Sequence, residues 1–264
     1  MLQLQNKFAS KKELYKHLKE NKDFYKNQKK ATTKTFVINS FGLTPSSASV
    51  VKADDEDGNI IKRTIVANTT MLLDSHNDVH VDGLWKRTLN AKSERIEHLA
   101  EHNFNFENLI SKETKVYTQE FEWQQLGAEY KGTTQALLMD TVIDKTINER
   151  FFNMYAKGLV EQHSVGMQYI QIELAINDSE MKEEYREFEK YIDLIGNKEQ
   201  AIEQGFFFVV KEAKLKEVSA VLAGSNNITP TLQDSHISTP KLELDSEPVT
   251  SKGFDWEKFN SNFK

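Results

Sequence analysis

The stretch Leu215-Lys216-Glu217-Val218-Ser219-Ala220-Val221-Leu222 decides the fold, because it predicts a strand whose two faces are both largely apolar. Successive side chains of a strand point to opposite faces, so Glu217 and Ser219 share one face. A strand of this kind belongs in the middle of a covered sheet. Glu217 would be buried there, and a buried carboxylate is costly without a partner. We therefore expect Glu217 to meet either a lysine or arginine, in a structural role, or a histidine, in a functional one.

Outward from this strand, the chain predicts further strands with a few helices inserted. Runs rich in β-branched and aromatic residues predict strands at 60–70, 116–123, 133–139, 159–174 and 206–210. Apolar residues at helical spacing predict helices at 144–157 and 180–195. The order has no regular strand–helix–strand rhythm. It favours an α+β fold in which a β-barrel or sheet carries peripheral helices.

Composition excludes several classes of protein. The 264 residues allow one domain with tails. The chain has no cysteine, which excludes a thiol nucleophile, a disulfide scaffold and a cysteine-ligated metal site. It lacks a run of about 18 apolar residues, so no membrane span is expected, and its N-terminus does not resemble a secretory signal. The net charge of -6 argues against nucleic acid as the main partner.

Charge and proline usage divide the chain into three parts. Residues 1–33 form a basic N-terminal extension, predicted to be helical and solvated, with nine lysines against three acids in the first 30 positions. Residues 34–224 form the predicted folded domain. Residues 225–264 contain three of the four prolines among polar residues, which predicts a flexible C-terminal tail.

Two stretches contain residues with catalytic chemistry. His98-Leu99-Ala100-Glu101-His102 matches the H-x-x-E-H pattern of inverted zinc peptidases. On a helix, His98 and His102 would face one side and could bind zinc, but no third ligand is singled out. His163-Ser164-Val165-Gly166-Met167 places a serine at the start of an alternating strand, with Gly166 leaving space beside it. Either match alone is as readily an ordinary structural element.

Taken together, three blocks in this order resemble the prohead serine protease family of tailed phages, a distant relative of the herpesvirus assembly proteases. The blocks are 82–111, which contains His102, then Gly158-Leu159 with 163–167, then 215–221. The chain departs from the family pattern at Asn103, where an aspartate is usual, and at Ser111, where a glycine is usual. A proline that usually follows the third block is also displaced. The resemblance covers roughly residues 60–228.

The resemblance implies a catalytic triad. Ser164 would be the nucleophile, His102 the general base, and Glu217 the residue that orients the imidazole. His102 is preferred to His98 as the base, because it directly precedes the position of the family's acidic residue. These residue types suit acyl transfer, since a serine needs an adjacent base and a carboxylate fixes the tautomer of that base. By the same resemblance, main-chain N–H groups around Gly224 to Asn226 would form the oxyanion hole.

The resemblance also implies a herpesvirus-protease-like β-barrel and a biological role. The expected enzyme is a serine endopeptidase that needs no cofactor or metal and cleaves capsid-protein and scaffold segments, or its own tails, inside the procapsid in the host cytoplasm. It is compatible with a homodimer, and neither a membrane nor a specific nucleic acid is expected as partner. Two alternatives stay open: a non-catalytic assembly protein with a protease-like domain, and the zinc peptidase built on His98 and His102.

Overall fold

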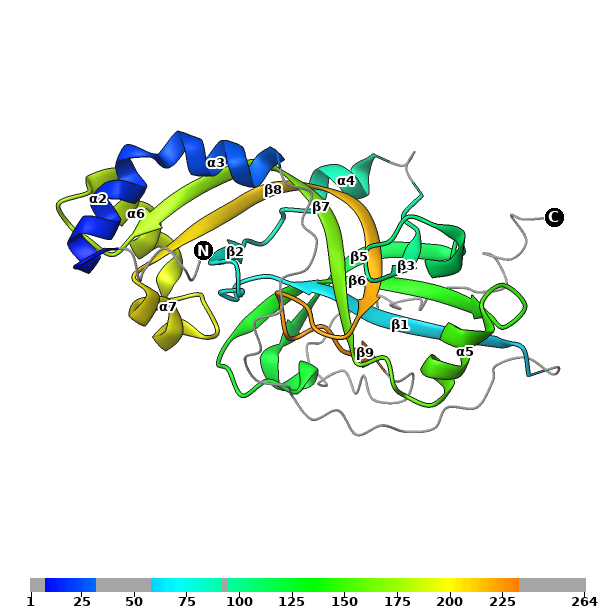
Figure 1. The fold of residues 1–264 in the computed structure, drawn as a ribbon. Coiled ribbons are helices and arrows are strands. Elements are labelled where there is room, and N and C mark those ends of the chain that lie inside the picture. The colour runs from blue at the N-terminus through cyan, green and yellow to red at the C-terminus, as the bar shows by residue number, and fades with distance from the viewer. Residues whose placement is uncertain (1–7, 32–57, 92–94, 233–264) are drawn as a thin grey trace.

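The structure, a computed structural model, describes residues 8–31, 58–91 and 95–232 of the chain and is a mixed α+β fold (Figure 1). Its α-helices are α2 (Lys11–Glu20), α3 (Lys22–Ala31), α4 (Lys86–Asn90), α5 (Glu149–Ala156), α6 (Lys182–Ile192) and α7 (Lys198–Gln204). Two 3-10 helices are η1 (Phe106–Asn108) and η2 (Trp123–Leu126). Its strands are β1 (Ile60–Thr69), β2 (Asp78–His80), β3 (His98–Ala100), β4 (Leu109–Ser111), β5 (Thr114–Glu122), β6 (Thr133–Asp144), β7 (Gln162–Ile176), β8 (Phe206–Val221) and β9 (Thr231–Leu232).

The strands form two sheets. One is antiparallel, in the order β5-β6-β1-β9. In the other, β8 pairs with β7 along one edge and, in parallel, with β2 and β3 along the other edge, and β4 follows β3. Helices and sheets are both present, so the predicted α+β class is confirmed. No closed barrel is found among the described strands, so the barrel stays a prediction. None of the described helices is long and apolar enough to cross a membrane.

Strand β8 is the central strand that the sequence predicts. It is one continuous strand that joins the two segments expected at 206–210 and 215–222, and nearly all of its residues are buried. Its first half is a run of phenylalanine and valine, which fits a pleated surface covered on both sides. Together β7 and β8 run from the end of the molecule that carries α2, α6 and α7 to the region of β1 (Figure 1).

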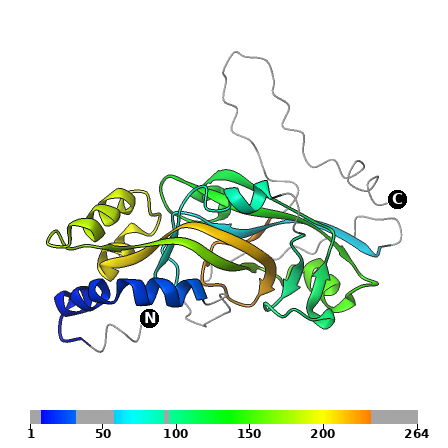
Figure 2. The same ribbon diagram turned by 90° about the horizontal axis from the view of Figure 1, so that it is seen from above.

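The basic N-terminal segment is helical, as expected, but it is not merely solvated. Helices α2 and α3 bury Leu14, Leu18 and Tyr25 in the main core, because each helix has one apolar stripe among its lysines. Lysines of the two helices form ion pairs with the domain, among them Lys26 with Glu173 of β7 at 2.8 Å. Figure 2 shows α3 lying alongside the β7–β8 ribbon. This segment is therefore part of the folded unit.

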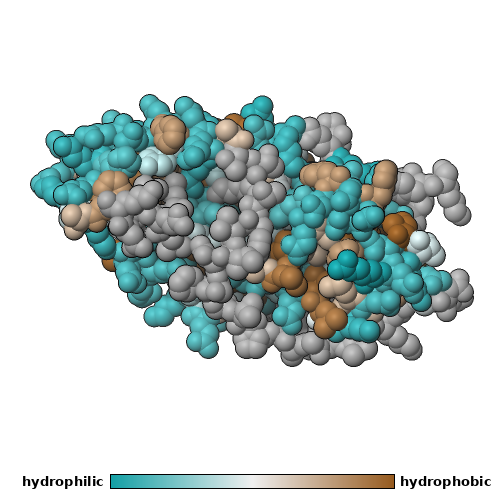
Figure 3. Space-filling model, in the orientation of Figure 1, coloured by the Kyte–Doolittle hydropathy of each residue, from teal (hydrophilic) through white to brown (hydrophobic). Residues whose placement is uncertain are grey.

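Packing continues past residue 224, where the sequence predicts the start of a tail. Asn226, Ile228 and Thr229 are buried, and β9 pairs with β1. Residues 233–264 lie outside the described residues. The face shown in Figure 3 is mainly hydrophilic with small separate apolar patches, as expected when the apolar side chains are gathered inside.

Candidate functional site

The site is built on one face of the β7–β8–β3 sheet. His102 follows β3, and its Nδ1–H donates to Oε1 of Glu217 on β8 at 2.6 Å. The other carboxylate oxygen of Glu217 accepts the hydroxyl of Ser219 at 2.5 Å. Oγ of Ser219 in turn accepts the backbone N–H of His102 at 3.1 Å. Both oxygens of this buried carboxylate therefore accept a hydrogen bond. Of the two kinds of partner expected for Glu217, the structure has the histidine.

Ser164 lies next to this group on the same face. Its Cα partner across the β7–β8 ladder is Ser219, and residues directly opposite each other in an antiparallel pair share a face. Ser164 and His102 line one small cavity, together with the segment at Ser225 and Asn226. Within the described residues, the hydroxyl of Ser164 has no hydrogen-bond partner. The structure thus brings together all three residues that the sequence singles out, with the hydroxyl available for another contact.

Gly166 makes room for the carboxylate. It pairs with Glu217 across the ladder, and a Cβ at this position would lie 2.1 Å from Oε1 of Glu217. No side chain tolerates such a distance without movement. The space that the sequence predicts beside Gly166 is therefore real, but the Glu217 side chain fills it.

The turn that carries His102 is strained. Glu101 has φ 53° and His102 has φ 57°, left-handed values that cost roughly 1–2 kcal/mol for each non-glycine residue. Hydrogen bonds hold the turn against β8: the N–H of Glu101 donates to the carbonyl of Ala220, and its carboxylate accepts the N–H of Leu222. Strain that is stabilised in this way is typical of residues whose side chains have a function.

His98 and His163 lie on the opposite face, where Tyr155 joins them. Nδ1–H of His163 donates to the carbonyl of Thr229, so in the neutral ring its Nε2 accepts the Tyr155 hydroxyl at 2.9 Å. The Tyr155 oxygen then accepts Nε2–H of His98 at 3.0 Å, and Nδ1 of His98 accepts the hydroxyl of Thr141. Every nitrogen of the two rings has a partner while both rings are neutral. The network is thus a structural element of the core.

This arrangement removes the geometry that the zinc alternative needs. The segment 98–102 is a short strand and a turn, not a helix, so His98 and His102 do not face one side. His98 is fully buried beneath the sheet, and His102 belongs to the other face. The helical reading of H-x-x-E-H is therefore wrong for this chain.

The buried histidines predict a loss of stability in acid. Burial lowers the pKa of His163 to about 4, with the Thr229 carbonyl opposing the shift, and burial lowers the pKa of His98 as well. Between about pH 6.5 and 4 the unfolded chain binds a proton at His163 while the folded chain does not, so the free energy of unfolding falls as the pH falls. For His163 alone the loss is about 3 kcal/mol.

Urea denaturation at pH 7, 6, 5 and 4 measures this loss. Titration of the ring proton signals by NMR, with His163→Gln used to assign them, checks its cause. A His163 signal that titrates near 6.5 in the folded protein would contradict the prediction.

The predicted oxyanion segment borders the same cavity. The N–H of Gly224 donates to Oε1 of Gln162, so it is already occupied. The backbone N–H groups of Ser225 and Asn226 have no acceptor among the described residues. The Asn226 side chain forms two hydrogen bonds with Thr69 of β1, which hold this segment against the other sheet. Ser225 and Asn226 are therefore the better donors of the three.

One group of described residues has the composition of a metal site. Ligand atoms of Asp74, His76 and Asp78 lie within 4.8 Å of one another. However, Oδ1 of Asp78 accepts the ammonium of Lys29 at 2.5 Å, and Oδ2 accepts the hydroxyl of Tyr169. Lys29 thus supplies the positive charge at this place, and nothing in the geometry calls for a metal.

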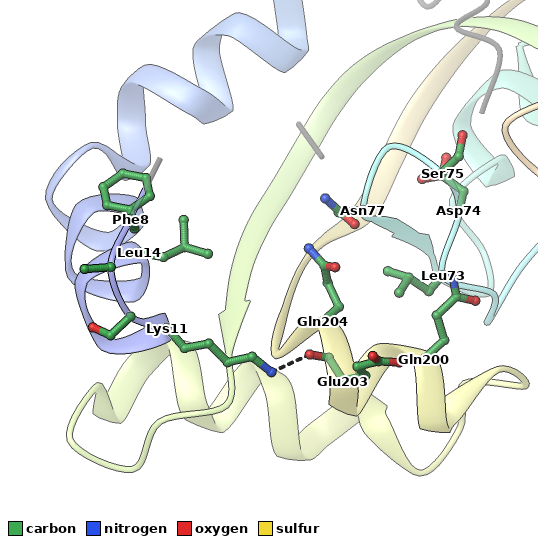
Figure 4. A pocket seen from close by; sticks show the side chains of 12 residues that line it. Phe8, Lys11, Leu14, Leu73, Asp74, Ser75, Asn77, Gln200, Glu203 and Gln204 are labelled. Carbon is green, nitrogen blue, oxygen red and sulfur yellow. Dashed lines mark hydrogen bonds between the residues drawn. The ribbon is translucent and has the colours of Figure 1, made fainter. Parts of the chain in front are cut away.

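A larger cavity, about 710 Å³, lies elsewhere. It lies among α2, α7 and the segment 73–77 (Figure 4), where Lys11 donates to the backbone carbonyl of Glu203. Its lining contains no histidine, so the serines there lack the imidazole base that a triad uses. The small cavity at Ser164 is the better candidate for chemistry.

The sequence does not single out two residues of the site, Ser219 and Asn68. Ser219 could be found from its spacing, because a residue two positions after Glu217 shares its face. Asn68 of β1 also lines the cavity, and nothing in its local sequence indicates this position. It reaches the site because a bulge at Val66/Asn68 interrupts the β1–β6 register.

Comparisons with family models, curated proteins and solved structures found no match.

Proposed function

We propose that this protein is a serine endopeptidase in which Ser164 is the nucleophile, His102 the general base and Glu217 the residue that orients the base. The hydrogen bond between His102 and Glu217 carries the proposal. It commits Nδ1 to the carboxylate and leaves Nε2 for the proton of a hydroxyl, and Ser164 lines the same cavity.

The proposed mechanism follows from these positions. His102 takes the proton of Ser164 as Oγ attacks the substrate carbonyl, and the buried carboxylate of Glu217 stabilises the imidazolium that forms. The amides of Ser225 and Asn226 are the proposed donors to the oxyanion, a kind of interaction typically worth about 3–4 kcal/mol in the transition state. His102 then returns the proton to the leaving amine, and water hydrolyses the acyl-enzyme.

The substrate class rests on the resemblance to prohead proteases alone. We propose capsid-protein and scaffold segments, and the chain's own termini, as substrates within a procapsid. We also propose a herpesvirus-protease-like β-barrel with peripheral helices as the finer architecture of the α+β fold. The lysine-rich helices α2 and α3 precede residues 32–57, so a cut there would separate a packed helical pair from the domain.

Covalent labelling tests the nucleophile without a known substrate. The protein is incubated with diisopropyl fluorophosphate, and the labelled peptide is located by mass spectrometry. We expect one adduct, on Ser164, because only a hydroxyl with an adjacent base reacts quickly. His102→Ala should slow labelling at least about 100-fold, as expected when a general base is lost.

Ser10→Ala is the matched control, since Ser10 caps α2 and lines the large cavity without a histidine. Its labelling should equal that of the wild type. Equal labelling of wild type and Ser164→Ala, or no adduct at all, would contradict the proposal and favour a non-catalytic assembly protein.

A further inference from the structure

The cavity at Ser164 has the size of a site for one water molecule, and polar side chains line part of it. Its volume is about 20 Å³, above the roughly 10–15 Å³ that one water needs. It is too small for a substrate side chain. Polar side chains from five parts of the chain line it, among them His102, Ser164 and Asn68. Both the base and the nucleophile line it, so a water here would lie beside both.

Asn68 lines this cavity and has a side-chain acceptor without a partner in the described part of the chain. It is 1 % exposed, and among the described residues its Oδ1 has no hydrogen-bond partner. Its Nδ2 lies 2.9 Å from Nδ1 of His80. A buried acceptor without a partner is costly, and a water in the cavity would satisfy it.

A buried chain of hydrogen bonds fixes which end of the Asn68 amide faces the cavity. Asp78 accepts the ammonium of Lys29 at one carboxylate oxygen, and the hydroxyl of Tyr169 donates to the other. The Tyr169 oxygen then accepts Nε2–H of His80 at 3.2 Å. Nδ1 of a neutral His80 can only accept, so Nδ2 of Asn68 donates to it and Oδ1 is left for the cavity.

We propose that Asn68 positions the water that hydrolyses the acyl-enzyme. The series of hydrogen bonds from Lys29 through Tyr169 and His80 sets the orientation of the Asn68 amide. This inference rests on the proposed function. One hydrogen of the water points to Nε2 of His102 and the other to Oδ1 of Asn68, which directs a lone pair of the oxygen at the acyl carbon.

The step balances without a further reactant. The water oxygen forms a bond to the acyl carbon as His102 takes one proton. The tetrahedral intermediate then collapses, the bond from the carbon to Oγ of Ser164 breaks, and Oγ takes that proton from His102. The products are a carboxylic acid and free Ser164.

The test separates acylation from deacylation with p-nitrophenyl acetate as the probe. Acylation releases a burst of p-nitrophenolate and leaves an acetyl group on Ser164, which intact mass detects, and deacylation sets the steady rate. We expect Asn68→Ala to keep the burst rate within about twofold and to slow deacylation about tenfold, since one hydrogen bond to the water is lost. Acetyl-enzyme should accumulate in this variant.

Tyr169→Phe interrupts the series of hydrogen bonds away from the cavity, because Tyr169 does not line the cavity. We expect slower deacylation with an unchanged burst rate here too, which keeps the inference testable if Asn68→Ala does not fold. Tyr25→Phe is the matched control. It removes another tyrosine hydroxyl that bonds a histidine, His17, outside the site, and should leave both rates unchanged.

The outcomes distinguish the two proposals. Wild-type deacylation rates in both Asn68→Ala and Tyr169→Phe would overturn the inference and leave the nucleophile intact. Failure of wild type to acquire an acetyl group on Ser164 would overturn the proposed function, and the inference with it. A loss of burst and of steady rate in equal proportion would assign Asn68 to acylation and also overturn the inference.

Discussion

Replacing Glu217 with glutamine is expected to lower kcat by about 10³–10⁴-fold, the effect of giving a triad histidine the wrong orienting group. In the wild type both carboxylate oxygens accept hydrogen bonds, one from His102 and one from Ser219. An amide has only one oxygen, so Glu217→Gln leaves either the imidazole or the serine facing an N–H donor. It also removes the charge that stabilises the imidazolium.

Turnover of an ester or peptide substrate, with the folded state checked by circular dichroism, measures this loss. Glu212→Gln is the matched control, because Glu212 is also on β8 but bonds Arg87 at the surface. Its kcat should match the wild type. Full activity of Glu217→Gln would mean that the carboxylate is structural and that His102 is not the base.

Changing Gly166 to alanine is expected to reduce kcat about as much as Glu217→Ala does, through one added methyl group. The new Cβ would meet Oε1 of Glu217 at 2.1 Å, so the carboxylate must move away from His102. Ser164 and His102 themselves are unchanged. The variant thus tests whether the position of the carboxylate, and not only its presence, is required.

A double-mutant cycle provides the control for Gly166→Ala. In Glu217→Ala the space beside Gly166 is open, so adding Gly166→Ala should cost no further activity, and the two effects should be far from additive. Losses that add, or full activity in Gly166→Ala alone, would show that the Gly166–Glu217 contact does not control the base.

The sequence predicts much of the site because strand alternation links distant residues to one face. Glu217 and Ser219 could be assigned a common face from their spacing of two, and the apolar neighbours of Glu217 place it in a central strand. His102 lies beside this strand through a parallel pairing of only three residues, 98–100 with 218–220. Local sequence does not predict so short a pairing, and only the motif order singles out this histidine.

Other features depend on tertiary contacts that a single sequence hides. The periodicity of α2 and α3 predicts helices, but whether Leu14 and Leu18 meet a core or a partner depends on the distant β7–β8 ribbon. Residues 225–232 are polar and contain a proline, yet their hydrogen bonds to β1 hold them in the fold. The H-x-x-E-H stretch has helical spacing, but the parallel pairing with β8 makes it a strand.

The large sequence separation of His102 and Glu217, 115 residues, has a consequence for synthesis. Strand β8 carries Glu217 and pairs with the strands that position Ser164 and His102. It leaves the ribosome after both Ser164 and His102. Long-range and parallel pairings form slowly, because loop closure must precede them. A nascent chain that has emerged only as far as α7 therefore contains Ser164 and His102 but has no strand to align them. The proposed peptidase is therefore expected to be inactive until β8 has emerged and paired, when nearly all of the described fold is complete.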